Sequence, residues 1–62
     1  MYWLEKDIYF KNQRVMADEI GIAHATLNRI LNRKNGCSKV MAYCITKAFN
    51  QDAEILDYFI KK

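Results

Sequence analysis

The spacing of apolar residues is helical along most of the chain, and no stretch sustains the alternation of apolar and polar residues that is typical of a strand. No proline interrupts this pattern. Between Met1 and Phe10, Leu4 and Ile8 stand four positions apart among aromatic residues, a spacing that predicts a short first helix. The aromatic side chains are too many for one narrow stripe, so we expect some of them to cover a neighbouring surface.

A second helix is predicted to begin at Gln13 and to end at Gly21. Asn12 precedes it and is a suitable N-cap, because its side-chain oxygen can accept a free backbone N–H of the first turn. Glycine directly after a helix adopts a positive φ without steric cost, so Gly21 is a suitable stop. The apolar side of this helix consists of Val15, Met16 and Ile20.

A third helix is predicted after a very short connection. At about 100° per residue, Leu27, Ile30 and Leu31 fall on one side of it. The other side is mostly polar and consists of Ala25, Asn28, Arg29, Asn32 and Arg33. Asn35 and Gly36 are predicted to close this helix in a turn.

Two more helices are predicted in the last third of the chain. Ser38 is a suitable N-cap for a fourth helix, which Asn50 ends in the left-handed conformation, and Asp52 is a suitable N-cap for the fifth. Their apolar residues at core spacing are Val40, Met41, Cys44, Ile45, Ala48 and Phe49 in the fourth helix and Ile55, Leu56, Phe59 and Ile60 in the fifth. The pattern therefore predicts an all-α protein, a compact bundle of five short helices that forms one domain over residues 1–62.

The length and composition exclude several classes of protein. A chain of 62 residues with 52% hydrophobic and 27% charged residues forms one small domain, without room for a dinucleotide fold or a two-domain enzyme. Cys37 and Cys44 are seven residues apart, which is two turns or about 10 Å if the segment is helical, and His24 is the only histidine, so neither a disulfide nor a zinc site is expected. We expect a cytoplasmic protein with reduced thiols, no metal or cofactor and no membrane span, and Met1 favours an intact small gene product.

The residues from Gln13 to Ile30 fit the steric requirements of a helix-turn-helix unit. A small side chain, Ala17, stands where the two helices are expected to cross, and Gly21 stands in the turn. The inward positions are apolar, namely Met16, Ile20, Ile22, Leu27 and Ile30. Agreement at all of these positions, two of which must be small, is moderately to strongly specific for this unit.

The same stretch resembles the lambda-repressor/Cro-type helix-turn-helix DNA-binding domains of phages and mobile elements. The likeness is carried by residues 13–22 and 23–27, in the family's order of Gln, two variable residues, an aliphatic–Ala pair, three variable residues, Gly and an aliphatic residue. It extends over roughly residues 12–60 and implies a five-helix bundle whose second motif helix enters the major groove of DNA. Ala23 replaces the family's usual Ser or Thr N-cap, and Leu31 replaces an acidic residue that forms an ion pair in many members.

The resemblance and the angular positions together predict which residues contact DNA. Outward side chains near the start of the second motif helix are expected to meet base edges. Arg29 is suited to guanine O6 and N7, Asn28 to adenine N6 and N7, and Ala25 to a thymine methyl group. The predicted base-contacting residues are His24, Ala25, Asn28 and Arg29. The predicted phosphate-contacting residues are Gln13, Arg14, Thr26, Asn32, Arg33, Lys34 and Asn35.

The sequence thus predicts a non-enzymatic regulator of Cro or repressor type, which binds double-stranded operator DNA as a homodimer and takes no small-molecule substrate. Catalysis is not expected, because no nucleophile–base pair stands at a suggestive spacing. Tyr58, Phe59 and Ile60, with the N-terminal aromatic residues, are candidates for a self-association surface. The alternative is a protein-interaction module on the same fold, such as an antirepressor, an antitoxin or a phage inhibitor. The low net charge of +3 favours this alternative, whereas the basic residues in or beside the motif favour DNA.

Overall fold

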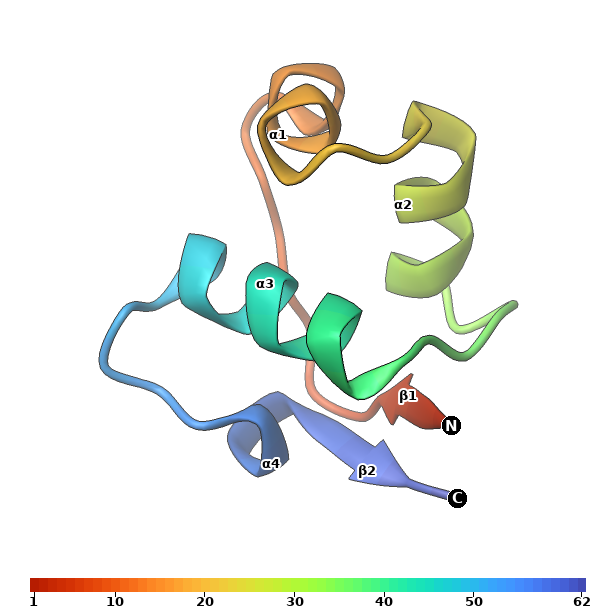
Figure 1. The fold of residues 1–62 in the computed structure, drawn as a ribbon, viewed down its shortest axis with the longest axis vertical. Helices are drawn as coiled ribbons and strands as arrows, with labels where there is room; N and C mark the ends of the chain where they lie inside the picture. The colour runs from red at the N-terminus through yellow and green to blue at the C-terminus, as the bar shows by residue number, and fades with distance from the viewer.

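Four helices and one two-stranded antiparallel sheet make up the fold in the computed structural model, which describes residues 1–62. The elements in chain order are β1 (Tyr2–Leu4), α1 (Gln13–Ile20), α2 (His24–Leu31), α3 (Lys39–Phe49), α4 (Ile55–Tyr58) and β2 (Phe59–Lys61). Figure 1 shows α1 and α2 above α3, and α3 above α4 and the sheet. The prediction of an all-α bundle of five helices is therefore wrong, because both ends of the chain form strands. None of the helices has the length and apolar character needed to cross a membrane.

The N-terminal segment is a strand followed by irregular chain instead of the predicted first helix. β1 and β2 pair in the register Tyr2 to Lys61, Trp3 to Ile60 and Leu4 to Phe59. The pairing continues to the chain ends, where the Met1 ammonium donates to the Lys62 carbonyl at 3.0 Å and the Lys62 N–H donates to the Met1 carbonyl at 2.9 Å. Leu4 and Ile8 are both buried, as their spacing suggested, but the chain brings them to the core without a helix. Aromatic residues favour strands, and here the partner strand lies at the far end of the chain.

The predicted last helix is reduced to the single turn of α4, which passes directly into β2. Its N-cap is Glu54, whose N–H donates to the Asp57 carboxylate at 2.8 Å, so the prediction that Asp52 caps this helix is wrong. Asn50 was expected in the left-handed conformation, but it is extended, with φ −150°, and its side chain accepts the Asp52 N–H at 3.1 Å. Phe59 then turns into the core as part of β2, with 1% of its surface exposed.

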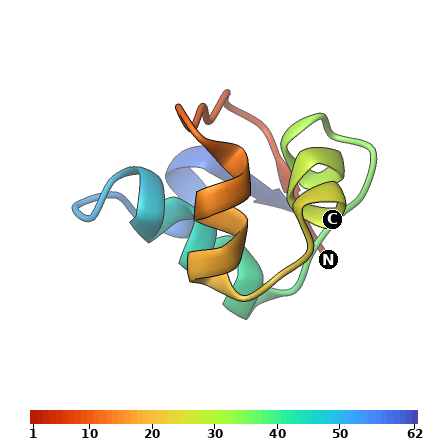
Figure 2. The ribbon, with the colours of Figure 1, turned by 90° about the horizontal axis from the view of Figure 1, so that it is seen from above.

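The first helix of the helix-turn-helix pair has the predicted termini. The Asn12 side chain accepts the Val15 N–H at 3.1 Å at the start of α1, and the Gly21 N–H donates to Ala17 after its last turn. Gly21 has a φ of 92°, the left-handed conformation that the turn requires. Ala23 precedes α2 without a side-chain cap hydrogen bond. Seen from above, α1 lies over α3 with α2 beside it (Figure 2).

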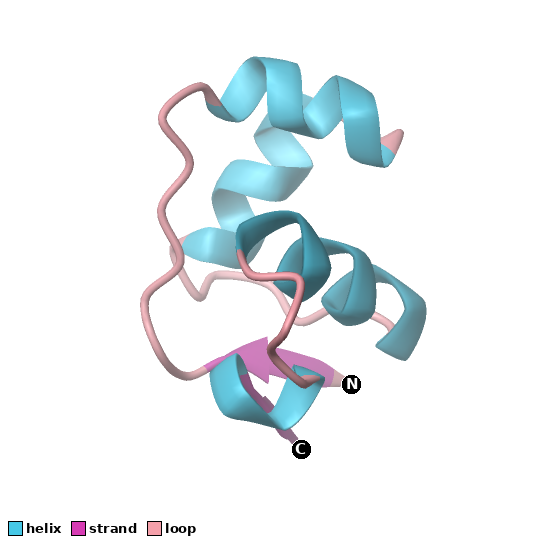
Figure 3. Ribbon diagram, turned by 90° about the vertical axis from the view of Figure 1, so that its left-hand side faces the viewer, coloured by secondary structure: helices cyan, strands magenta, loops and turns pink.

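The core lies where the three longer helices meet the sheet (Figure 3). Its buried members are Leu4, Ile8, Phe10, Ala17, Leu27, Ile30, Leu31, Cys37, Ala42, Ile45 and Phe59. In α3 the predicted core residues are only partly correct, because Val40 is 72% exposed and Phe49 is 39% exposed. The Phe49 ring instead meets Phe10 and Tyr58 edge to face, with centroids 6.1 and 5.4 Å away.

The connection between α2 and α3 is fixed to the N-terminal segment. α2 ends at Leu31, before the predicted turn, and Arg33 takes a positive φ of 61°. The Arg33 guanidinium donates to the Leu4 carbonyl at 3.1 Å and the Glu5 carbonyl at 2.9 Å, and it pairs with the Asp7 carboxylate at 2.8 Å. The Tyr2 and Cys37 backbones also exchange two hydrogen bonds. The two segments are thus joined by side-chain and backbone contacts.

We expect Gly36→Ala to lower the free energy of unfolding by about 1–3 kcal/mol, because a Cβ at this position would come within 2.8 Å of the Trp3 indole. Denaturant unfolding monitored by Trp3 fluorescence measures the change. Gly21→Ala is the matched control: it has open space around the added Cβ and a cost of about 1–2 kcal/mol from its positive φ alone. Only Gly36→Ala should alter the emission of the folded state, and stability within about 0.5 kcal/mol of wild type would contradict the close Trp3 contact.

We expect Arg33→Ala to destabilise the protein by about 1–2 kcal/mol, because two backbone carbonyls lose a charged donor. Asp7→Ala should change stability by less than about 1 kcal/mol, since the Asp7 side chain is 91% exposed and its ion pair is screened by water. Thermal unfolding of the two variants tests this order. Equal effects would mean that the ion pair, and not the pair of carbonyl contacts, holds the segment.

Candidate nucleic-acid interface

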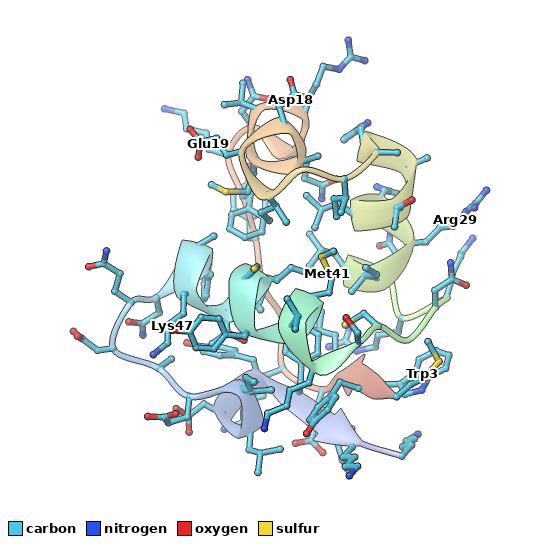
Figure 4. All side chains as sticks on the ribbon, in the orientation of Figure 1. Trp3, Asp18, Glu19, Arg29, Met41 and Lys47 are labelled. Atoms are coloured by element: carbon cyan, nitrogen blue, oxygen red, sulfur yellow. The ribbon has the colours of Figure 1, made fainter.

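The surface of α2 is divided between a buried apolar side and an exposed side. Leu27, Ile30 and Leu31 are 0%, 2% and 8% exposed, and they attach the helix to the core. The predicted base-contacting residues His24, Ala25, Asn28 and Arg29 are all exposed, and Thr26 is exposed as well. At about 100° per residue, the four base-contacting positions fall within an arc of roughly 140°. In Figure 4 the Arg29 side chain extends outward from α2, away from the rest of the protein.

The start of α1 lies beside the outer side of α2. The Asn28 side-chain amide donates to the Gln13 side-chain carbonyl at 3.3 Å, which joins the first residue of α1 to the middle of α2. Arg14 follows Gln13 and is exposed. The positive end of the α1 dipole and the free N–H groups of its first turn are therefore close to the outer side of α2, an arrangement suited to a phosphate group.

Asn32 also takes part in this contact. It is the C-cap of α2, and its side-chain amide donates to the Asn28 side-chain carbonyl at 3.1 Å. Asn28 therefore uses one donor and one acceptor within the protein. Sequence reasoning treated Gln13, Asn28 and Asn32 as separate DNA contacts and missed the bonds between them. The four-residue spacing of the two asparagines was a signal for their pairing, because such residues are neighbours on a helix.

Beyond α2, the predicted phosphate contacts divide into two groups. Lys34 and Asn35 are exposed, and the Lys34 N–H donates to the Arg29 carbonyl at 2.9 Å, so this part of the loop continues from the end of α2. The guanidinium of Arg33 instead faces the N-terminal segment, where it has the three partners described above. The structure thus gives Arg33 a role in the fold that sequence reasoning did not foresee.

Charge is unevenly distributed around the motif. α2 contains no acidic residue, and Arg29 and Lys34 lie at its C-terminal end. The acidic residues of α1, Asp18 and Glu19, project from the sides of that helix that face away from α2 (Figure 4). The outer side of α2 is therefore free of carboxylates that would repel a polyanion, although the whole chain carries a net charge of only +3.

A second exposed surface lies between α3 and α4. It is a shallow groove of about 500 Å³ lined by Tyr2, Lys39, Tyr43, Glu54, Ile55 and Leu56. Leu56 and Tyr43 are 69% and 52% exposed, so the groove presents apolar side chains to solvent. Neither residue belongs to the helix-turn-helix pair, and the groove is therefore a separate candidate site for a protein partner.

The two cysteines are free thiols. Cys37 is buried beside β1, and burial raises the pKa of its thiol against the opposing effect of the N-terminal ammonium. A buried thiol with a raised pKa is a poor nucleophile, which gives Cys37 a packing role.

No protein-family model matches the chain, and neither a curated protein nor a solved structure is significantly similar to it. The assignment of a function to the outer side of α2 therefore depends on the geometry and charge described above.

Proposed function

We propose that this protein is a sequence-specific, double-stranded DNA-binding regulator of Cro or repressor type, which places α2 in the major groove of operator DNA. The observation that carries the proposal is the outer side of α2, which is exposed, free of acidic residues and bordered by the capped start of α1. An α-helix with its side chains is about 10–12 Å in diameter, which suits a major groove about 12 Å wide.

In this proposal exposed residues along the whole of α2 read the bases. Arg29 donates to guanine O6 and N7, Asn28 pairs with adenine, and Ala25 packs on a thymine methyl group. His24 stands at the start of α2, where it meets a base edge or a phosphate.

The groups around α2 hold the sugar–phosphate backbone. They are Gln13, Arg14, Thr26, Asn32, Lys34 and Asn35. Arg33 is omitted because its guanidinium is bound to the N-terminal segment. Because few basic side chains face the DNA in this arrangement, the affinity for DNA of any sequence is modest. Contacts to the bases must therefore supply most of the discrimination between sites.

Two copies are part of the proposal, because one copy presents one α2 and regulators of this size commonly bind two half-sites one DNA turn apart. Phe59 is buried and contributes nothing to a partner surface, whereas Ile60 is 38% exposed and the groove between α3 and α4 presents Tyr43 and Leu56. The exposed apolar surface therefore supports self-association through residues other than those of α2.

The second candidate function is a protein-interaction module, and the same groove favours it. Its exposed Tyr43 and Leu56 would bind an apolar segment of a partner protein, and the net charge of +3 suits such a role. Selection from a random duplex library at two salt concentrations separates the two functions. Enrichment of one sequence supports the regulator, and the absence of enrichment at low salt contradicts it and favours the interaction module.

We expect Arg29→Ala to weaken binding to the selected duplex by about 1–3 kcal/mol and to relax the preference at one base pair, because a bidentate contact to guanine is lost. Binding titrations on duplexes changed at single positions measure both effects. Lys6→Ala is the charge-matched control, since Lys6 lies beside Asp52 and Asp57 in a depression next to α4. An equal loss in both variants, with base preference unchanged, would contradict the placement of Arg29 in the groove.

We expect Lys34→Ala to weaken binding to all duplexes alike and to reduce the slope of log K against log salt concentration by about 1, because one phosphate contact is lost. Titrations over a salt series with the selected duplex and an unrelated duplex give this slope. A loss confined to the selected duplex, or an unchanged slope, would place Lys34 away from the DNA backbone.

A further inference from the structure

Three side-chain amides form a hydrogen-bonded chain across the outer side of the helix-turn-helix pair. Asn32 Nδ2 donates to Asn28 Oδ1 at 3.1 Å, and Asn28 Nδ2 donates to Gln13 Oε1 at 3.3 Å. The three residues come from the C-cap of α2, the middle of α2 and the first turn of α1. We call this set, Gln13, Asn28 and Asn32, the amide chain.

We propose that the amide chain makes Asn28 selective for adenine over guanine, with Asn32 and Gln13 as specificity-determining residues that act through Asn28. The inference rests on the proposed insertion of α2 into the major groove. It goes further in explaining the choice of adenine by the internal hydrogen bonds of Asn28 and in giving Asn32, otherwise a phosphate contact, a role in base selection.

The selectivity follows from counting donors and acceptors on Asn28. A primary amide has two N–H donors and an oxygen with two lone pairs. The bonds to Gln13 and Asn32 use one donor and one lone pair, so one of each is left. Adenine presents one acceptor, N7, and one donor, the N6 amino group, in the major groove, and this matches what is left.

Guanine fits the remaining groups poorly. Its major-groove edge presents two acceptors, N7 and O6. An asparagine without internal partners can turn its amino group toward both of them, but Asn28 has already given one N–H to Gln13, and its oxygen is held by Asn32. Binding guanine in this way would break the internal hydrogen bond or leave lone pairs of Asn28 and guanine facing each other. Either outcome lowers the affinity for guanine.

A phosphate bound at Gln13 would influence the direction in which the hydrogen bonds of the amide chain run. Its oxygen accepts from Asn28, so its Nε2 group keeps both N–H donors for another partner. A phosphate oxygen only accepts hydrogen bonds, so a phosphate beside the start of α1 favours this orientation of Gln13. Reversal of one amide requires reversal of all three, and a phosphate at Gln13 therefore stabilises the observed orientation, in which the remaining N–H of Asn28 lies on the side of Gln13 and its remaining lone pair lies on the side of Asn32.

The test compares Asn32→Ala with Asn35→Ala on the duplex that the wild-type protein selects from a random library. Asn35 is an exposed asparagine just beyond α2, and as a proposed phosphate contact it should affect duplexes with adenine and with guanine alike, so it is a matched control for the ratio of their affinities. The base pair that Asn28 reads is identified with the variant Asn28→Ala. At that base pair the variant should lose about tenfold or more of the wild-type preference for one base. Asn32→Ala should lower the ratio of adenine to guanine affinity at that position by about 2- to 10-fold, the value of one hydrogen bond, whereas Asn35→Ala should leave it unchanged.

A second variant covers the case in which Asn32→Ala disturbs the end of α2. Asn32→Leu keeps the approximate shape of the side chain but can neither donate to Asn28 nor accept from it, so the ratio of adenine to guanine affinity should fall about as far as in Asn32→Ala. In the free protein, the side-chain amide NMR signals of Asn28 should shift in Asn32→Ala and stay in place in Asn35→Ala.

The outcomes distinguish the inference from the proposed function. If the wild-type protein selects no sequence, the proposed function fails. If it selects a sequence in which Asn28 reads a base, but the base is not adenine or the ratio is the same in wild type and Asn32→Ala, the amide chain has no role in specificity and the proposed function stands. Unchanged Asn28 amide signals in Asn32→Ala would overturn the chain itself.

Discussion

The orientation of α2 depends on the burial of Leu27, Ile30 and Leu31 against α1 and the core. Leu27 and the Ala17 side chain are both fully buried, so the two helices of the motif approach closely where one side chain is small. Because these three positions of α2 are occupied by packing, the remaining positions face outward. The exposed side of α2 is thus a consequence of the core, and the Gly21 turn sets the path of the chain between the two helices.

The sheet and the Arg33 contacts complete a core that four short helices alone would leave open. β1 and β2 bring the chain ends together and cover one end of the core with Leu4 and Phe59. Arg33 then links the loop after α2 to the segment after β1. A chain of 62 residues buries a modest share of its surface, so its folded state has little stability to spare. A contact that orders two loops at once therefore makes a relatively large contribution to stability. The same contact fixes the loop that carries Lys34.

Local signals in the sequence correctly predicted both ends of α1 and the start of α3, but not the conformation of Asn50 or the cap of α4. The caps at Asn12 and Ser38 and the positive φ of Gly21 each depend on residues within one turn, and all three are confirmed. The two strands were missed because their stability comes from pairing between opposite ends of the chain, which no short window contains. The amide chain and the carbonyl contacts of Arg33 were missed for a related reason, since most of these bonds join residues far apart in sequence.

We propose that the outer side of α2 is the surface that meets DNA. NMR titration of the ¹⁵N-labelled protein with its selected duplex tests this claim most directly, because every backbone N–H reports separately. We expect saturable, sequence-dependent shifts concentrated at residues 24–32 and at the start of α1. Shifts confined to the groove around Tyr43 and Leu56, or the same small shifts with every duplex, would contradict it.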